Sequence, residues 1–155
     1  MAVDVKAFER VLAEVIKAES GIKKVILVDR TGLTIAYTTR FSYFKVDVDG
    51  IGAIASAVYC ASEEQGKGLE LGELQIVTSE FEHGKIFAAS CGKGILCVIT
   101  DETVNIGMVR LLMKKASEQL KVILDEFLAE KPVVPLTEGE EEEELKAAFG
   151  ELEKV

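Results

Sequence analysis

The chain has little positive charge and few of the residues on which catalysis or metal binding usually depends. Its 155 residues include one histidine, three cysteines and no tryptophan, and 27 Asp and Glu outnumber 18 Lys and Arg. Nucleic acids and anionic membranes attract proteins through a positive field, so a net charge of -9 argues against both as partners. We find no apolar run near the roughly 20 residues of a membrane span.

The cysteines and the N-terminus favour a cytoplasmic protein. Cys60, Cys91 and Cys97 are odd in number and lie in apolar sequence, which is typical of buried, reduced thiols. Acidic and basic residues recur from Asp4 and Lys6 onward, so no uninterrupted apolar region of a secretory signal peptide follows. We therefore expect no secretion signal and a reducing compartment.

The scarcity of proline suggests a division of the chain into two parts. The only two prolines are Pro132 and Pro135, and they mark a linker after the last long amphipathic stretch. Residues 1–130 carry 19 acidic against 15 basic residues, a net charge of -4, and residues 131–155 carry 8 against 3, a net charge of -5. We predict a domain over 1–130 followed by an acidic tail.

Two interpretations of this tail stay open. Thr137-Glu-Gly-Glu140 resembles a capping box, and the run Glu140–Glu144 suits the N-terminus of a helix. A helix beyond it would place Leu145, Phe149 and Leu152 on one face, as a partner-binding element. The alternative is a frayed, solvated tail, because so short a helix is marginal without a surface to pack on.

Within the domain, hydrophobic periodicity and turn residues predict the order α-β-β-α-β-β-β-α. A tight hairpin is expected at Asp29-Arg-Thr-Gly32, and Asp47 or Asp49 can cap the middle helix. The predicted helices cover about 3–20, from 47 or 49 to about 65, and 103–130. The predicted strands cover 24–29, 33–37, 73–79, 85–91 and 95–100.

This order predicts an α/β (α+β) fold with a five-stranded antiparallel sheet between helices. The first and last helices can cover one face of the sheet. The middle helix is rich in glycine, alanine and serine, and alone it is too thin to cover five strands on the other face. The apolar surface left over predicts self-association.

Three patterns that could suggest chemistry have simpler explanations. Gly66-Lys67 and Gly92-Lys93 lack the remaining residues of a phosphate-binding loop and read as turns. The string from Asp47 to Gly50 resembles part of a calcium loop, but the first and twelfth ligand positions would hold no acid. Helix capping explains it better.

The thiols and the histidine do not form a reactive pair in the predicted strands. His83 and Cys91 would lie at opposite ends of one strand, about 26 Å apart at ~3.3 Å per residue. With a three-residue turn at 92–94, Cys91 and Cys97 are expected on one face of the hairpin but not opposite each other. We therefore predict neither a catalytic set nor a metal or cofactor site, and a protein that is not an enzyme.

Several strings resemble the Roadblock/dynein light-chain family. They are Val28-Asp-Arg-Thr-Gly-Leu-Thr-Ile-Ala36, the small-residue helix from Ile51, and Asn105-Ile-Gly-Met-Val-Arg110 at the start of the last helix. Together with the element order, the resemblance covers residues 8–127. The hairpin string also occurs in other sensor-like α/β folds, so the combination carries the resemblance.

The resemblance implies a profilin-like sheet in a homodimer or heterodimer, in which the third strands of the two chains pair edge to edge and the two middle helices meet. On this sequence the edge strand would be 72–79. The implied dimer interface is Ile51, Ile54, Ala55, Val58, Ser62, Gln75 and Val77.

The resemblance also implies function through partners. Prokaryotic members often regulate Ras-like small GTPases, binding the GTP form and stimulating hydrolysis without donating an arginine finger. We therefore expect a homodimeric GTPase regulator. The alternatives are a scaffold or light-chain adaptor subunit and a ligand-sensing domain.

Overall fold

A computed structural model describes residues 5–40, 47–130 and 150 of the chain. The predicted tail element, with Leu145, Phe149 and Leu152, lies outside the described residues. The helices are α1 (Val5–Ala18), α2 (Val48–Gly68) and α3 (Ile106–Glu130). The strands are β1 (Ile22–Asp29), β2 (Thr34–Thr39), β3 (Val77–Phe81), β4 (Gly84–Cys91) and β5 (Gly94–Thr100). The predicted order of elements is confirmed.

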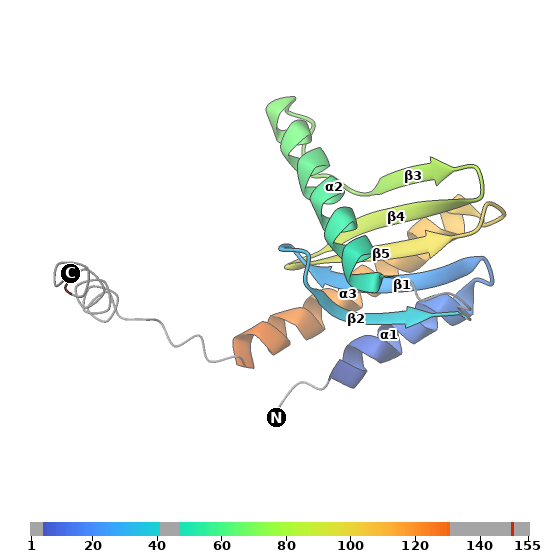
Figure 1. Cartoon of the computed structure of the whole chain (residues 1–155), viewed down its shortest axis with the longest axis horizontal. Helices are drawn as coiled ribbons and strands as arrows, with labels where there is room; N and C mark the ends of the chain where they lie inside the picture. Colours follow the sequence, from blue (N-terminus) through green and yellow to red (C-terminus); the bar gives the residue numbers. More distant parts are fainter. Residues whose placement is uncertain (1–4, 41–46, 131–149, 151–155) are drawn as a thin grey trace.

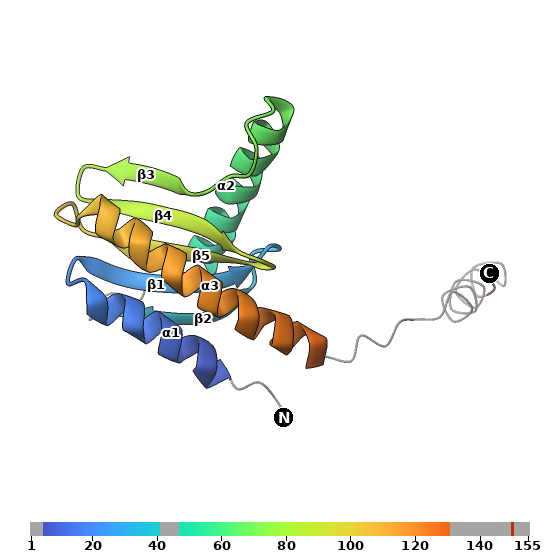
Figure 2. The ribbon, with the colours of Figure 1, turned by 180° about the vertical axis from the view of Figure 1, so that it is seen from behind.

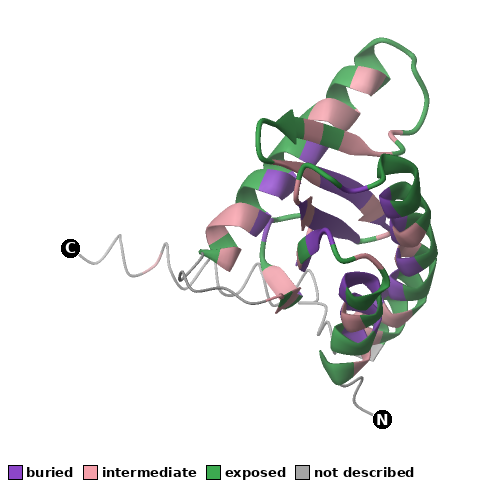
Figure 3. Ribbon diagram, turned by 90° about the vertical axis from the view of Figure 1, so that its right-hand side faces the viewer, coloured by how far each residue is buried: buried purple, intermediate pink, exposed green. Residues whose placement is uncertain are grey.

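The elements form three layers around one antiparallel sheet of order β2-β1-β5-β4-β3. Helix α2 crosses one face of the sheet (Figure 1), and α1 and α3 lie side by side on the other (Figure 2). Figure 3 views these layers from the side and shows buried residues concentrated between them. Among the helices that the structure describes, none is long and apolar enough to cross a membrane.

The larger core lies between the sheet and the pair α1–α3. Phe8 and Leu12 of α1 and Leu120 of α3 are fully buried against Leu27 and Leu96 of the sheet. Each such side chain contributes roughly 1.5–3 kcal/mol when removed from water. This core fixes α1 and α3, so the first and last helices share a face, as the sequence predicts.

Capping residues set where α2 and α3 begin. The Asp47 side chain accepts a hydrogen bond from the Gly50 amide at 2.9 Å, and Asn105 Oδ1 accepts one from the Met108 amide at 3.0 Å. The start of α3 is three residues later than predicted, because Thr103 is held in a turn. Its amide and hydroxyl both donate to Asp101 Oδ1.

The hairpin between β1 and β2 is organised by the Asp29 carboxylate. Asp29 Oδ1 accepts hydrogen bonds from the amides of Thr31 (2.9 Å) and Leu33 (3.0 Å) and from the Thr31 hydroxyl. Burial raises the pKa of Asp29, but these hydrogen bonds outweigh it and lower the pKa below its ordinary value. Gly32 takes a φ of 94°, which favours glycine.

Helix α2 runs past the predicted end near Gln65 and continues through Gly66 and Gly68. It stops where Glu70 takes a positive φ of 56° and the Leu71 amide bonds back to the Gly66 carbonyl at 2.9 Å. The glycines therefore do not end the helix. Its last turns project beyond the sheet (Figure 1).

The edge strand lies later in the chain than the predicted range of 73–79. Pairing begins with Val77 opposite Ala88 and ends with Phe81 opposite Gly84. The preceding segment lies outside the ladder, and its Leu74 carbonyl accepts a hydrogen bond from the buried Tyr59 hydroxyl of α2 at 3.1 Å. The predicted interface residue Gln75 therefore precedes β3 and is not part of it.

The expectation that Cys91 and Cys97 share a face is wrong. The turn has two residues, so Cys91 lies opposite Gly94, and Cys97 lies opposite Ala88. An odd offset along a strand places two side chains on opposite faces. Cys91 is buried beneath α3 and Cys97 beneath α2.

Candidate interaction surface

One side of α2 presents apolar side chains to solvent. Ala55 and Tyr59 point down to the sheet and are buried. Ile54 and Val58, four residues apart and therefore on one side of the helix, keep 67% and 43% of their surface exposed. Ile51 lies on the same flank and is half-buried.

The sheet beside this flank is incompletely covered. Val77, Ile86 and Ile99 pack against the smaller core beneath α2 but remain partly exposed. Phe81 follows Val77 at an even spacing, so it lies on the same face of β3, and it is 60% exposed. We call the exposed and half-buried apolar residues of this region the α2–β3 surface: Ile51, Ile54, Val58, Val77, Phe81, Ile86 and Ile99.

Strand β3 borders this surface and forms one of the two edges of the sheet, with β2 at the other. It pairs with β4 on one side only, so its other side presents backbone donors and acceptors outward. An open edge next to exposed apolar side chains is a template for adding another strand. The α2–β3 surface therefore offers both apolar area and directional hydrogen bonding.

The structure brings together only some of the residues that the sequence nominates for an interface. Ile51, Ile54, Val58 and Val77 belong to the α2–β3 surface, and Ser62 lies half-buried further along α2. The exceptions are Ala55, which is buried against the sheet, and Gln75, which is exposed in the segment before β3. Sequence reasoning did not nominate Phe81, Ile86 or Ile99. No local pattern marks them, because β5 is apolar on both faces and only strand pairing places the three residues near one another.

An ion pair that the sequence does not suggest fixes α2 to two turns. Arg30, in the β1–β2 turn, lies 3.0 Å from the Glu63 carboxylate of α2. It also donates hydrogen bonds to the Ser90 hydroxyl (3.2 Å) and the Gly92 carbonyl (3.4 Å). The hydrogen bond with Glu63 raises the pKa of Arg30 above its ordinary value. Both partners are partly exposed, so the pair is worth about 1 kcal/mol or less, and its role is to orient α2.

The thiols and the histidine occupy different environments. Burial raises the pKa of Cys91 and Cys97 to about 12, so neither forms a thiolate near neutral pH. His83 is exposed in the β3–β4 turn next to Glu82. The described ranges contain no group of three or more His, Cys, Asp or Glu side chains placed to hold a metal ion.

Known proteins resemble this chain in both sequence and fold. The family description "Roadblock/LC7 domain" matches residues 8–100. The uncharacterized protein MJ1340 of Methanocaldococcus jannaschii is 41% identical over 115 residues, which cover 74% of this chain and 97% of the relative.

Among solved structures, MglB with a tetrameric arrangement has a TM-score of 0.73 at 23% identity, over 79% of this chain and 90% of MglB. The gliding protein MglB from Thermus thermophilus has a TM-score of 0.71 at 24% identity, over 78% and 90%. At these identities the two structures show a common fold. The family match and the M. jannaschii relative go further and show that this chain belongs to the Roadblock/LC7 family.

Proposed function

We propose that the protein is a dimeric regulator of a Ras-like small GTPase. It would bind the GTP form and modulate hydrolysis without supplying catalytic groups. Membership of the Roadblock/LC7 family supports this class of function, because the family resemblance implies GTPase regulation. The α2–β3 surface carries the proposal, since exposed apolar flanks of this kind mark interaction sites.

The dimer that we propose joins two copies through this surface. Antiparallel pairing of two β3 edges would extend the sheet and bring the two α2 helices together over Val77, Ile86 and Ile99. An interface of two-fold symmetry uses the same patch on both copies, and the α2–β3 surface has apolar residues on both the helix and the strand. Ile54 and Val58 would lie at the helix seam.

The GTPase would bind across the outer side of the paired α2 helices. Ala57 is exposed there, and such a small side chain lets another backbone approach closely. Positioning the catalytic loop of the GTPase itself needs shape and hydrogen bonds rather than a reactive side chain. Arg30 is engaged by Glu63, Ser90 and Gly92, which favours a structural role over insertion into a nucleotide site.

Titration of candidate Ras-like GTPases tests this function. Each GTPase is loaded with GDP or with a non-hydrolysable GTP analogue, and its affinity for the protein is measured, followed by single-turnover GTP hydrolysis. We expect tighter binding of the GTP form, a changed hydrolysis rate, and loss of both effects in Ile54→Asp. Val122→Asp is the matched control, because Val122 is a similarly exposed residue on α3.

Equal weak binding of both nucleotide states, with unchanged hydrolysis, would contradict the regulatory role. If partners are instead recovered in a manner that needs residues 131–155 and ignores nucleotide, an adaptor function replaces it.

A further inference from the structure

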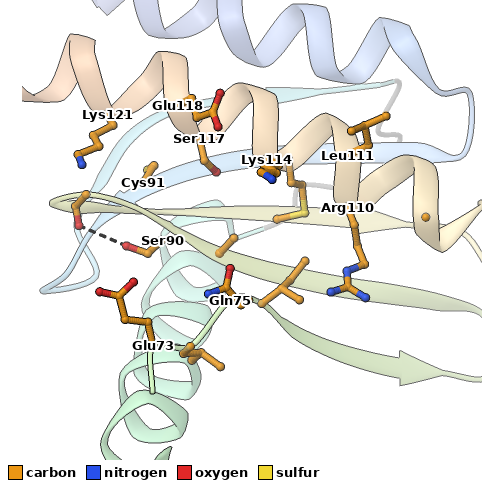
Figure 4. A pocket seen from close by; sticks show the side chains of 16 residues that line it. Glu73, Gln75, Ser90, Cys91, Arg110, Leu111, Lys114, Ser117, Glu118 and Lys121 are labelled. Carbon is orange, nitrogen blue, oxygen red and sulfur yellow. Dashed lines mark hydrogen bonds between the residues drawn. The ribbon is translucent and has the colours of Figure 1, made fainter. Parts of the chain in front are cut away.

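A second surface lies on the opposite side of the molecule from α2. A groove of about 690 Å³ runs between α3 and the segment that precedes β3, with the end of β4 as its floor (Figure 4). Leu74 and Ile76 line one wall, and Leu111 and Met113 line the other. Leu74 and Ile76 precede β3, and Leu111 and Met113 belong to α3. The apolar walls of the groove therefore come from residues outside the paired strands.

Basic side chains border the groove in a protein that is acidic overall. Arg110, Lys114 and Lys121 of α3 line it, against Glu73 and Glu118. Residues 107–121 carry four basic and one acidic residue, a net charge of +3, whereas the whole chain has -9. This part of α3 is thus suited to an acidic, amphipathic occupant.

The groove wall also contains an unsatisfied polar atom. The Ser117 hydroxyl is buried and has no hydrogen-bond partner among the described residues. Figure 4 shows it between Lys114 and Lys121 on the side of α3 that faces the groove. A buried hydroxyl without a partner costs about 1–3 kcal/mol, and an occupant would recover this only if the Ser117 side chain turned toward the groove, because its oxygen is closed to solvent.

We propose that this groove is the docking site for residues 140–152 of the same chain. That segment is acidic at its start, with Glu140–Glu144, and its Leu145, Phe149 and Leu152 recur at helical spacing. Docked as a helix, it would place this stripe on the apolar wall residues and its acids near Lys121 and Lys114. The proposal goes beyond the proposed function and does not depend on it.

The lengths of the segments agree with docking in an antiparallel direction. At 1.5 Å per residue, α3 extends about 14 Å from Lys121 to its end, and about 21 Å separate Gly107 from Lys121. The linker 131–139 spans at most about 30 Å, so it can return to Lys121. A helix over 140–152 would be about 20 Å long, which matches the groove.

Hydrogen exchange on the full chain tests the proposal. We expect amides of 140–152 to exchange at least about tenfold more slowly than random-coil rates. In the variant that combines Lys114→Glu with Lys121→Glu, the exchange rates of these amides should return to within about twofold of the random-coil rates. Arg10→Glu combined with Lys17→Glu is the matched control, with the same charge change and the same spacing on α1, and it should leave protection intact. Unchanged exchange in β1 and β5 shows that each variant is folded.

A charge swap makes the test specific. Glu141→Lys with Glu144→Lys in the tail should abolish protection in the wild-type groove and restore it in the Lys114→Glu, Lys121→Glu background. Exchange of 140–152 at random-coil rates in the wild type would overturn the proposal. Protection that persists in the Lys114→Glu, Lys121→Glu variant would overturn it as well. A third outcome is protection that appears only when the Lys114→Glu, Lys121→Glu chain is mixed with the Glu141→Lys, Glu144→Lys chain. This result would overturn docking within one chain and show that the tail binds the groove of a second copy.

Discussion

Two adjacent residues of the β1–β2 turn, Asp29 and Arg30, act on different parts of the fold. Asp29 closes the turn locally through its hydrogen bonds to residues 31 and 33. Arg30 instead reaches Glu63 on α2 and the β4–β5 turn. The first role follows from local sequence, and the second exists only because the fold brings α2 over the turn.

Replacing Asp29 by Asn should destabilise the domain in a pH-dependent manner. Because the folded-state pKa of Asp29 is lowered, its carboxylate stabilises the fold above the unfolded pKa near 3.8, and this contribution is lost as the pH falls through the folded value. We expect Asp29→Asn to cost roughly 1 kcal/mol at pH 7 and the difference to shrink below about pH 4. Urea unfolding at several pH values measures it, with the exposed Glu126→Gln as control. A cost independent of pH would show that the charge is not involved.

At the scale of elements, α2 combines a tightly packed start with a projecting end. Gly52 lies so close to the sheet that an added Cβ would come within 2.6 Å of Val28 Cγ1. An added Cβ at Gly66 or at Gly68 would meet no atom within 4 Å. At the start of α2 a glycine is needed because the helix packs closely on the sheet. At its end, the space around each glycine would accept a larger side chain.

This contrast predicts opposite effects of alanine within α2. Gly66→Ala and Gly68→Ala should each stabilise the protein by up to about 1 kcal/mol, because alanine lowers the entropy cost of forming a helix. Gly52→Ala should destabilise it by about 1–3 kcal/mol, because the buried Val28 cannot move aside without disturbing β1. Thermal unfolding of the three variants measures this. Destabilisation by the two distal substitutions would indicate that another chain contacts the end of α2.

At the scale of the whole molecule, the two faces of the sheet are covered unequally. Two helices bury one face in a large core, and α2 alone crosses the other, leaving the α2–β3 surface beside an open edge strand. The asymmetry is the physical basis for the proposed dimer. It also separates the proposed GTPase-binding side from the groove on α3.

A charge on the α2 flank should convert the proposed dimer to monomers. Ile54→Asp or Val58→Asp would bury two carboxylates per dimer in an apolar seam, so we expect the dissociation constant to rise at least about a hundredfold. Light scattering across a dilution series gives the mass, and Val122→Asp on α3 should leave it unchanged. A monomeric wild type at micromolar concentration would contradict the dimer itself, and an unchanged mass in both flank variants would place the seam elsewhere.

Much of the fold could be predicted because its signals are local. The Asp29–Gly32 turn, the cap at Asp47 and the periodicity of α1 each depend on residues a few positions apart. The errors have both kinds of cause. Before β3, the Leu74 carbonyl accepts a hydrogen bond from Tyr59, fifteen residues away in the chain, which no local pattern shows. The turn at Asp101 and Thr103 and the two-residue turn after Cys91 are local, but hydrophobic periodicity does not fix their geometry.

The candidate surface divides in the same way. The family resemblance nominates Ile54 and Val58 for the interface. It does not nominate their neighbours Phe81, Ile86 and Ile99, which strand pairing brings together. Patterns along the chain are enough to give the order of elements, the family and the shortage of cover on one sheet face. Three features depend instead on contacts between segments distant along the chain, and they emerge only when the chain is folded: which flank of α2 stays open, which residues border that flank, and the groove between α3 and the segment before β3.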